Sequence, residues 1–179
     1  VRGQRTSLEA LQRAALQQDQ EQLGPWLTQH GVAERPRLAN LLQVEPGYET
    51  AVESVLGPWL QAVAAGEMPE VDDAPPAALG LVSDGQSGAM AVPATVAGAR
   101  PLIAAVEGPA VLMALLDGVY YTDDSSTVAQ RAHHLKAGQR LGTSDGSMFG
   151  PGYRWYASAG ATVDSVIARE RMLKQLHQD

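Results

Sequence analysis

The stretch LQVEPGYETAVESVLG, from Leu42 to Gly57, decides how this chain folds. It enters as an apolar, strand-like step, turns at a Pro-Gly pair, and continues as a short amphipathic helix. The helix is expected to end at Gly57, because glycine is the preferred residue just beyond a helix C-terminus. Glu49 and Glu53 are expected to face water, whereas the apolar residues at helical spacing predict one buried face. That face comprises Tyr48, Ala51, Val52, Val55 and Leu56.

Polar helical segments flank this region at both ends of the chain. Residues 6–23 and residues 163–177 each carry only a narrow apolar stripe among Gln and charged residues. A narrow stripe suits pairing with one other helix better than burial in a globule. We therefore expect the two segments to pair antiparallel, with Leu11 and Leu173 in the seam. Gly24-Pro25 is expected to break or kink the first segment.

The part between these segments is predicted to alternate short helices with short strands. Its length allows one domain, or two small subdomains that share a core. Ser-Asp-Gly occurs at residues 83–85 and 144–146, each time after a predicted strand, as either a faint internal repeat or a chance match. The pattern predicts helices at 36–42, 109–116 and 127–135, a helix end or strand at 59–65, an acidic Pro-rich loop at 67–78, and strands at 79–82, 89–96, 102–106, 119–122, 141–143 and 153–157, the last two paired.

The net charge of −7 is unevenly distributed over the 179 residues. Between Val44 and Gln130, Arg100 stands as the one basic residue against twelve acidic ones, and this acidic middle is expected to repel nucleic acid. From Arg131 to Lys174, seven basic residues outnumber three acidic ones. The chain has no cysteine and no apolar run of membrane-spanning length, so we expect a cytoplasmic protein without membrane contact. It starts without Met and ends inside a helical pattern, which suggests a fragment of a longer chain.

No arrangement of residues in the sequence points to an enzyme. His133 and His134 are adjacent on a predicted helix, where side chains point about 100° apart and cannot chelate one metal ion. Asp123 and Asp124 follow a predicted strand, a position where ligands bind in α/β enzymes, but they also precede a helix that they can cap. The loop from Gly146 to Gly152 lacks a phosphate-binding motif. We assign no catalytic residue, cofactor or metal, and keep as the alternative function a free-standing small-molecule-binding or hydrolytic α/β domain that uses Asp123, Asp124 and this loop.

Three blocks of sequence, in a set order, carry a family resemblance. Residues 44–57 hold a Gly, an aromatic residue, a Glu, an Ala-Val-Glu triplet and a closing Leu-Gly. Residues 115–124, LLDGVYYTDD, read as a leucine-rich helix followed by a strand and an Asp-Asp step, and residues 129–146 read as a helix and a strand ending in Thr-Ser-Asp-Gly. This order resembles the hinge domain of bacterial structural-maintenance-of-chromosomes (SMC) proteins over roughly residues 37–160. The chain departs from the family pattern in the loop at 67–78 and at residues 150–155.

The resemblance implies an α+β fold of two small mixed α/β subdomains flanked by N- and C-terminal coiled-coil helices. It divides the chain into an N-terminal arm (residues 1–34), a hinge (35–160) and a C-terminal arm (161–179). The family forms homodimers by adding exposed strand edges of one protomer to those of the other, and the matching glycines at the expected interface are Gly142, Gly146 and Gly150. The implied function is the homodimerisation hinge of a nucleoid-associated SMC ATPase in chromosome condensation and segregation. Its ATPase heads and its contacts with accessory condensin subunits would lie in regions absent from this chain.

The resemblance also implies a weak DNA contact where the hinge meets its coiled coil. Solvated surface charge is the alternative interpretation of the basic residues at that junction. Because the chain as a whole is acidic, we expect little or no DNA binding at about 150 mM salt. The residues available for such a contact are Arg35, Arg37, Arg154, Arg169, Arg171 and Lys174.

Overall fold

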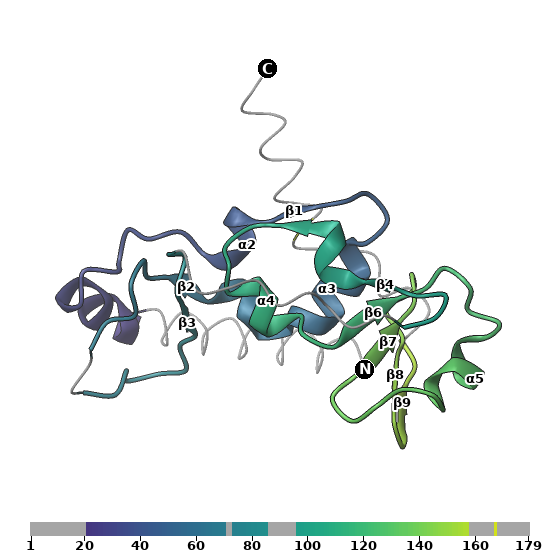
Figure 1. Ribbon diagram of the computed structural model, residues 1–179. Coiled ribbons are helices and arrows are strands. Elements are labelled where there is room, and N and C mark those ends of the chain that lie inside the picture. Colours follow the sequence, from purple (N-terminus) through teal and green to yellow (C-terminus); the bar gives the residue numbers. More distant parts are fainter. Residues whose placement is uncertain (1–20, 71–72, 86–95, 158–166, 168–179) are drawn as a thin grey trace, which may run out of the picture.

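A computed structural model describes residues 21–70, 73–85, 96–157 and 167 of the chain. Its elements form three groups, with a small sheet at one end, short helices in the middle and a larger sheet at the opposite end (Figure 1). Within the described residues, no helix is both long and apolar enough to cross a membrane. The mixture of helices and small sheets confirms the predicted α+β class.

The middle of the molecule is built around the stretch that opens at Leu42. Its elements are α2 (Leu38–Leu41), β1 (Gln43–Val44), α3 (Glu49–Leu56), the 3-10 helices η1 (Gly57–Gln61) and η2 (Leu102–Ala105), β5 (Val106–Glu107) and α4 (Leu112–Leu115). β1 pairs antiparallel with β5, which joins two distant parts of the sequence. α3 forms where predicted and buries Ala51, Val52 and Leu56 in the main hydrophobic core. Glu53 is half-buried rather than fully exposed, because it accepts a hydrogen bond from the backbone of Ile167.

The smaller end combines a helix with a pair of parallel strands. The strands are β2 (Val63–Ala64) and β3 (Leu81–Val82). Residues 21–29 are helical through Gly24-Pro25, so the predicted break at that pair is wrong. Burial of the neighbouring apolar side chains offsets the weak local helix propensity of glycine and proline. These side chains form a separate cluster, which contains Leu23, Trp26, Leu27, Val32 and Val63.

The larger end is a five-stranded sheet in the order β4-β6-β7-β8-β9. The strands are β4 (Arg100–Pro101), β6 (Val119–Tyr121), β7 (Arg140–Gly142), β8 (Met148–Gly150) and β9 (Tyr153–Trp155). β6 and β7 run parallel, connected through α5 (Val128–Ala132), and the other neighbours run antiparallel. One face of the sheet packs with α5 in a second core, which includes Tyr120, Val128, Leu141 and Phe149.

The predicted strand at residues 102–106 is wrong. The 3-10 helix η2 occupies most of it, between the short strands β4 and β5. Leu102 and Ala105 are buried whereas Ala104 is exposed. A spacing of three between buried residues fits a 3-10 turn, in which positions i and i+3 share a side, and does not fit the alternation of a strand.

The predicted pairing of residues 141–143 with residues 153–157 is also wrong. β8 lies between β7 and β9 and pairs with both. The Ser-Asp-Gly turn reverses the chain at once, so the apolar pair Met148-Phe149 enters the sheet directly after it. Part of the segment from Gly146 to Gly152, predicted as a loop, is therefore a buried strand.

The two predicted flanking helices, residues 6–23 and 163–177, fall almost entirely outside the described residues. Residues 6–20 of the first arm, and all of residues 163–177 except Ile167, are not described, and neither is most of the predicted strand at 89–96. Ile167 is helical, buried and part of the main core. The antiparallel pairing through Leu11 and Leu173 therefore stays a prediction.

Candidate interaction surface

β9 is the last strand on one side of the five-stranded sheet, and no described strand pairs with its outer edge. Trp155 and the following Tyr156 each expose 66% of their surface, and Tyr153 exposes 45%. An edge strand presents unpaired backbone donors and acceptors, and large exposed aromatic side chains beside them provide apolar contact area. The edge therefore has the chemistry of a protein–protein contact.

The two faces of β9 carry different side chains. Trp155 stands opposite Met148, which belongs to the main core, and Arg154 stands opposite Phe149, which packs with α5. Because side chains alternate along a strand, Arg154 lies on the α5 face and Trp155 on the other. Tyr156 packs edge-on against Phe149, with the ring centroids 5.5 Å apart. The aromatic residues therefore extend around the edge rather than over one face.

Two of the predicted interface glycines, Gly142 and Gly150, lie in the neighbouring strands β7 and β8. Gly150 is paired with Tyr153, whose ring covers it so closely that any Cβ on Gly150 would collide with the ring. A Cβ on Gly142 would lie 3.3 Å from the terminal methyl of Met148. Both glycines are buried within the chain, and their lack of a side chain leaves space for Tyr153 and Met148. Their direct contact with a second copy remains a prediction.

Gly146 is buried against α3 of the same chain. Its φ of +87° is a backbone conformation that favours glycine, and a Cβ there would lie 3.1 Å from the Thr50 methyl. The Ser54 hydroxyl donates a hydrogen bond of 2.9 Å to the Gly146 carbonyl. Gly146 therefore packs inside the protomer, where it joins the turn between β7 and β8 to α3.

Asp145 closes that turn through its carboxylate. It accepts hydrogen bonds from the Thr143 hydroxyl (2.6 Å), the Ser147 backbone N–H (2.9 Å) and the Ser147 hydroxyl (3.0 Å). These bonds, the one from Thr143 foremost, hold the pKa of Asp145 below its usual value. The Ser147 hydroxyl also accepts a hydrogen bond from the backbone of Ala157, two residues beyond β9. The turn therefore positions the chain that leaves the edge strand.

α3 contacts both this turn and Ile167, which lies in the predicted C-terminal arm. Ser54 contacts Gly146, and the adjacent Glu53 accepts a 2.7 Å hydrogen bond from the backbone N–H of Ile167. Ile167 is itself only 5% exposed, in the same core as α3. One short helix therefore contacts both Ile167 and the turn that precedes β8.

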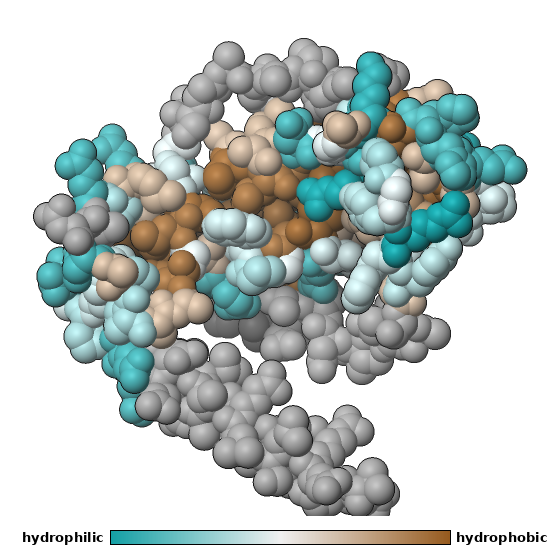
Figure 2. Space-filling model, turned by 90° about the horizontal axis from the view of Figure 1, so that it is seen from below, coloured by the Kyte–Doolittle hydropathy of each residue, from teal (hydrophilic) through white to brown (hydrophobic). Residues whose placement is uncertain are grey.

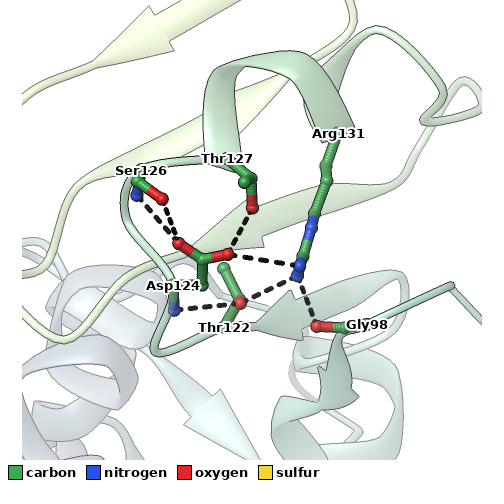
Figure 3. Close-up of polar contacts among 6 residues, drawn as sticks. All are labelled: Gly98, Thr122, Asp124, Ser126, Thr127 and Arg131. Atoms are coloured by element: carbon green, nitrogen blue, oxygen red, sulfur yellow. Dashed lines mark hydrogen bonds and ion pairs between the residues drawn. The ribbon is translucent and has the colours of Figure 1, made fainter.

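Asp124 has a structural role in the turn before α5 (Figure 3). Its carboxylate accepts hydrogen bonds from Ser126 and Thr127, which lower its pKa, and lies 3.5 Å from the Arg131 guanidinium. Arg131 also donates to the Gly98 carbonyl at 2.6 Å and to the Thr122 hydroxyl at 3.1 Å. Asp124 orders the turn upstream of α5 instead of capping the helix, whose N-cap Thr127 has no side-chain cap bond.

Asp123 faces a different neighbour from Asp124. Burial, followed by a hydrogen bond to the Asp123 carboxylate, raises the pKa of Tyr121 to about 12. The Tyr121 ring packs on Tyr48 at 4.4 Å, and these two rings with Arg100 and Asp123 line an open hollow of about 490 Å³. Among the described residues, no three acidic or histidine side chains are placed to hold a metal ion. Asp123 and Asp124, which the alternative function would use together, thus make separate structural contacts.

The basic residues expected at a DNA contact are not gathered where the structure describes them. Arg35 pairs with Asp84 at 2.7 Å and also donates to the Ala64 carbonyl, and Arg37 donates to the Gln61 carbonyl. Both lie at the small-sheet end, whereas Arg154 lies in β9 at the opposite end. Arg169, Arg171 and Lys174 fall outside the described residues.

The aromatic edge itself was not predicted from the sequence. The available signal is the run Tyr153-Arg154-Trp155-Tyr156 directly after the turn at Pro151-Gly152. An aromatic residue on both sides of a charged one predicts a strand with contrasting faces. Its position at the edge of a sheet depends on strand order, which the run does not encode.

Residues 33–132, more than half of the chain, match the family described as "SMC proteins Flexible Hinge Domain". The chain is 30% identical to the chromosome partition protein Smc of Methylococcus capsulatus and 32% identical to that of Coxiella burnetii, over 98% and 95% of its own length. It spans only 15% of the length of each of these relatives.

The fold is similar to the SMC hinge domain of Geobacillus stearothermophilus, solved as an asymmetric dimer, with a TM-score of 0.57 at 21% identity over 95% of this chain and 85% of that one. It is also similar to a Pyrococcus furiosus Smc hinge domain with an extended coiled coil, with a TM-score of 0.53 at 16% identity over 97% of this chain and 68% of that one. The chain therefore belongs to the SMC hinge domain family, as the hinge of a bacterial Smc-type chromosome partition protein.

Proposed function

We propose that this hinge holds two copies of its parent protein together by pairing the β9 edge with a second copy. The observation that carries the proposal is the exposure of Tyr153, Trp155 and Tyr156 at a sheet edge that no described strand covers. The hinge dimer of Geobacillus stearothermophilus, which has a similar fold, supports it.

Burial of this edge is favourable on two counts. Backbone N–H and C=O groups along β9 would gain partners from a strand of the second copy. The aromatic side chains would lose contact with water, and burial of a Trp or Tyr contributes most where it fills the centre of an interface. A stable interface must bury about 1,000 Å² or more, so neighbouring parts of the sheet end would take part.

The parts of the chain beneath the edge make it suitable for pairing. Gly150 leaves room for the Tyr153 ring, and Gly142 leaves room for Met148. Gly146 supports the edge indirectly, through its hydrogen bond from Ser54 of α3. In this proposal the three glycines shape the edge from inside the protomer, and the aromatic residues make the contact.

The biological role follows from where the hinge sits in its relatives. The hinge itself is not catalytic, and ATP hydrolysis would belong to head domains elsewhere in the longer protein. Dimerisation here would join two pairs of helical arms, residues 1–34 and 161–179 of each copy, in a complex for chromosome condensation and segregation. We expect this complex in the cytoplasm on the nucleoid, with condensin subunits bound to other regions and only weak DNA contact at the hinge.

Sedimentation equilibrium tests the proposal directly. The wild-type chain should sediment as a dimer at about micromolar concentration. Trp155→Asp places a charge in the proposed interface, and should weaken dimerisation by about thirtyfold or more, the effect of losing one interface hot spot. Trp155→Phe keeps an apolar ring and is the matched control.

The outcome depends on the folded monomer being intact in each variant. Trp155 is mostly exposed, so both variants should keep the wild-type circular dichroism spectrum and unfolding midpoint when compared as monomers. A wild-type chain that stays monomeric at these concentrations would reject the proposal. Equal dimerisation of wild type and Trp155→Asp would show that dimers form through another surface.

A further inference from the structure

The chain contains three Asp-Gly dipeptides, and the structure describes all of them. An Asp-Gly pair is chemically reactive, because the backbone nitrogen of the glycine can attack the side-chain carboxyl carbon of the aspartate and glycine has no Cβ to hinder the approach. The three pairs therefore place one reactive dipeptide in three folded environments. They are Asp84-Gly85, Asp117-Gly118 and Asp145-Gly146. On the face shown in Figure 2, polar residues lie mainly at the two ends of the molecule, on either side of an apolar middle.

The reaction conserves atoms and needs only water. The glycine nitrogen bonds to the Cγ of the protonated carboxyl group, the Cγ–O bond breaks, and the hydroxyl leaves with the N–H proton as water, which closes a five-membered succinimide. Water then opens the ring at either carbonyl. Opening at the former backbone carbonyl gives isoaspartate, in which the main chain runs through the aspartate side chain and a free α-carboxylate remains.

At Asp84-Gly85, hydrogen bonds hold both of the groups that would react. The Asp84 carboxylate accepts a bond of 2.7 Å from the Arg35 guanidinium. The backbone N–H of Gly85 donates to the Gly66 carbonyl at 3.4 Å. Attack of this nitrogen on the carboxyl group requires both contacts to open.

Asp145-Gly146 is held in the same way. The Asp145 carboxylate accepts bonds from Thr143 and Ser147, and the backbone N–H of Gly146 donates to the Thr143 carbonyl at 3.0 Å. The bonds to the carboxylate hold the pKa of Asp145 below its usual value, which keeps the group ionised and a poor electrophile. This pair is therefore protected at both reacting groups.

Asp117-Gly118 differs from the other two pairs. Asp117 is exposed in the turn between α4 and β6, and its carboxylate has no hydrogen bond or ion pair with a described residue. The backbone N–H of Gly118 likewise has no hydrogen-bond partner in the part of the chain that the structure describes. Both groups that would react are thus free.

We propose that Asp117 is a site of spontaneous backbone modification, where isoaspartate forms before it forms at the other two Asp-Gly pairs. The inference goes beyond the proposed dimer and does not depend on it. Asp117 combines the reactive dipeptide with an exposed carboxyl group and an unbonded glycine nitrogen.

Isoaspartate at residue 117 would disturb the five-stranded sheet. Gly118 precedes β6, and its carbonyl accepts a 2.7 Å hydrogen bond from the backbone of Arg140 in β7. Gly118 has a φ of +69°, and a Cβ on it would collide with the Gly138 carbonyl. Isoaspartate adds a methylene group to the main chain directly before this close contact. The modification should therefore loosen β6 against β7 and destabilise the sheet.

Incubation of the folded chain at neutral pH in water enriched in oxygen-18 tests the proposal, because each ring opening incorporates one heavy oxygen. Peptide mass spectrometry with electron-transfer dissociation locates the label and the isoaspartate. Both should accumulate at Asp117 about tenfold faster than at Asp84 or Asp145, since opening two hydrogen bonds of ordinary strength slows a reaction by about that factor. In denaturant, where the folded contacts are absent, the three pairs should react at similar rates.

Two variants separate the chemical step from its structural consequence. Asp117→Glu keeps the negative charge but cannot form the five-membered ring, so it should keep its unfolding midpoint after incubation, whereas incubated wild type should contain a second, less stable population. Arg35→Gln releases the Asp84 carboxylate, and should raise the rate at Asp84 without changing that at Asp117; circular dichroism verifies that it is folded.

The outcomes decide the inference whatever the oligomeric state. Equal rates at the three pairs of the folded chain, or a slower reaction at Asp117 than at either other pair, would overturn the proposed site. Isoaspartate at residue 117 that leaves chemical denaturation unchanged would overturn the proposed effect on the sheet. A wild-type chain that stays monomeric would reject the proposed function and leave these rates unaffected.

Discussion

The two Ser-Asp-Gly turns place one tripeptide in two different surroundings. Each follows the second strand of a parallel pair, β2–β3 at one end and β6–β7 at the other. At the small-sheet end, Asp84 pairs with Arg35, and Ser83 donates to the Gly66 carbonyl, so the turn is tied to segments earlier in the chain. At the larger end, Asp145 bonds within its own turn, which sends the chain directly into β8.

This difference accounts for how the described chain continues after the turn at the larger end. A turn that satisfies its own carboxylate can reverse the chain tightly, and two further antiparallel strands follow it. The result at the larger end is an aromatic edge that no described strand covers. The parallel strand pairs support an internal repeat, and the contrast between them is open to experiment.

The largest expected difference concerns the glycines of the two turns. Gly146→Val should lower the free energy of unfolding by about 3 kcal/mol, because a β-branched residue would have to adopt positive φ and push against Thr50. Gly85→Val should cost less than about 1 kcal/mol, since a Cβ there meets only ordinary contacts of 3.5 Å and longer. Chemical denaturation at matched protein concentration measures both. Equal losses would show that the two turns are under the same constraint.

A smaller difference is expected between the two aspartates, and it should depend on pH. Asp145→Ala should destabilise the chain by about 1 kcal/mol at neutral pH through loss of the bonds within the turn. Because the folded-state pKa of Asp145 is lowered, its stabilisation is present above the unfolded value of about 3.9 and is lost as pH falls through the lower folded value. The variant should therefore approach wild-type stability in acid, as followed by denaturation from pH 7 to about pH 2.5. Asp84→Ala is the comparison variant at the small-sheet end. A difference in unfolding free energy between Asp145→Ala and wild type that did not narrow in acid would contradict this account.

The support of the larger end by α3 should contribute somewhat less. Ser54→Ala removes the hydroxyl that donates to the Gly146 carbonyl and should cost about 0.5–1 kcal/mol. Hydrogen exchange of the backbone N–H groups of Ser147 and Ala157 should accelerate, whereas that of Ala65 in the small-sheet end should not. Uniform acceleration at both ends would indicate global destabilisation instead of a local support.

The smallest effect is expected for DNA. The isolated chain should show no measurable binding to duplex DNA at about 150 mM salt, because the acidic end and middle oppose the few cations near β9. At low salt, any binding that appears should weaken with salt at a logarithmic slope of about −3 to −4, as for three or four phosphate contacts. Fluorescence anisotropy measures both, and Arg154→Glu should reduce the low-salt signal. Tight binding that resists salt would place a basic surface outside the described residues.

Several elements were predictable because their signals are local. The helix α3 is encoded by apolar spacing between Pro46 and Gly57, and β3 and β6 by short apolar runs before polar turns. The strand predicted at 102–106 failed because a short apolar run is compatible with both a strand and a 3-10 turn. The Gly24-Pro25 pair failed as a helix break because packing of Trp26 and Leu27, which is a long-range effect, outweighs local propensity.

The family, the α+β class and the core helix could be read from the sequence, because periodicity, turn residues and motif order are local features of the chain. Three features required the folded molecule: the packing of Gly146 inside the protomer, the position of β8 between β7 and β9, and the exposure of Tyr153, Trp155 and Tyr156 at an edge that no described strand covers. Strand order and burial depend on contacts between residues that are far apart in sequence. Ser54 and Gly146 illustrate it: they are 92 positions apart, and their hydrogen bond exists only once the chain has folded.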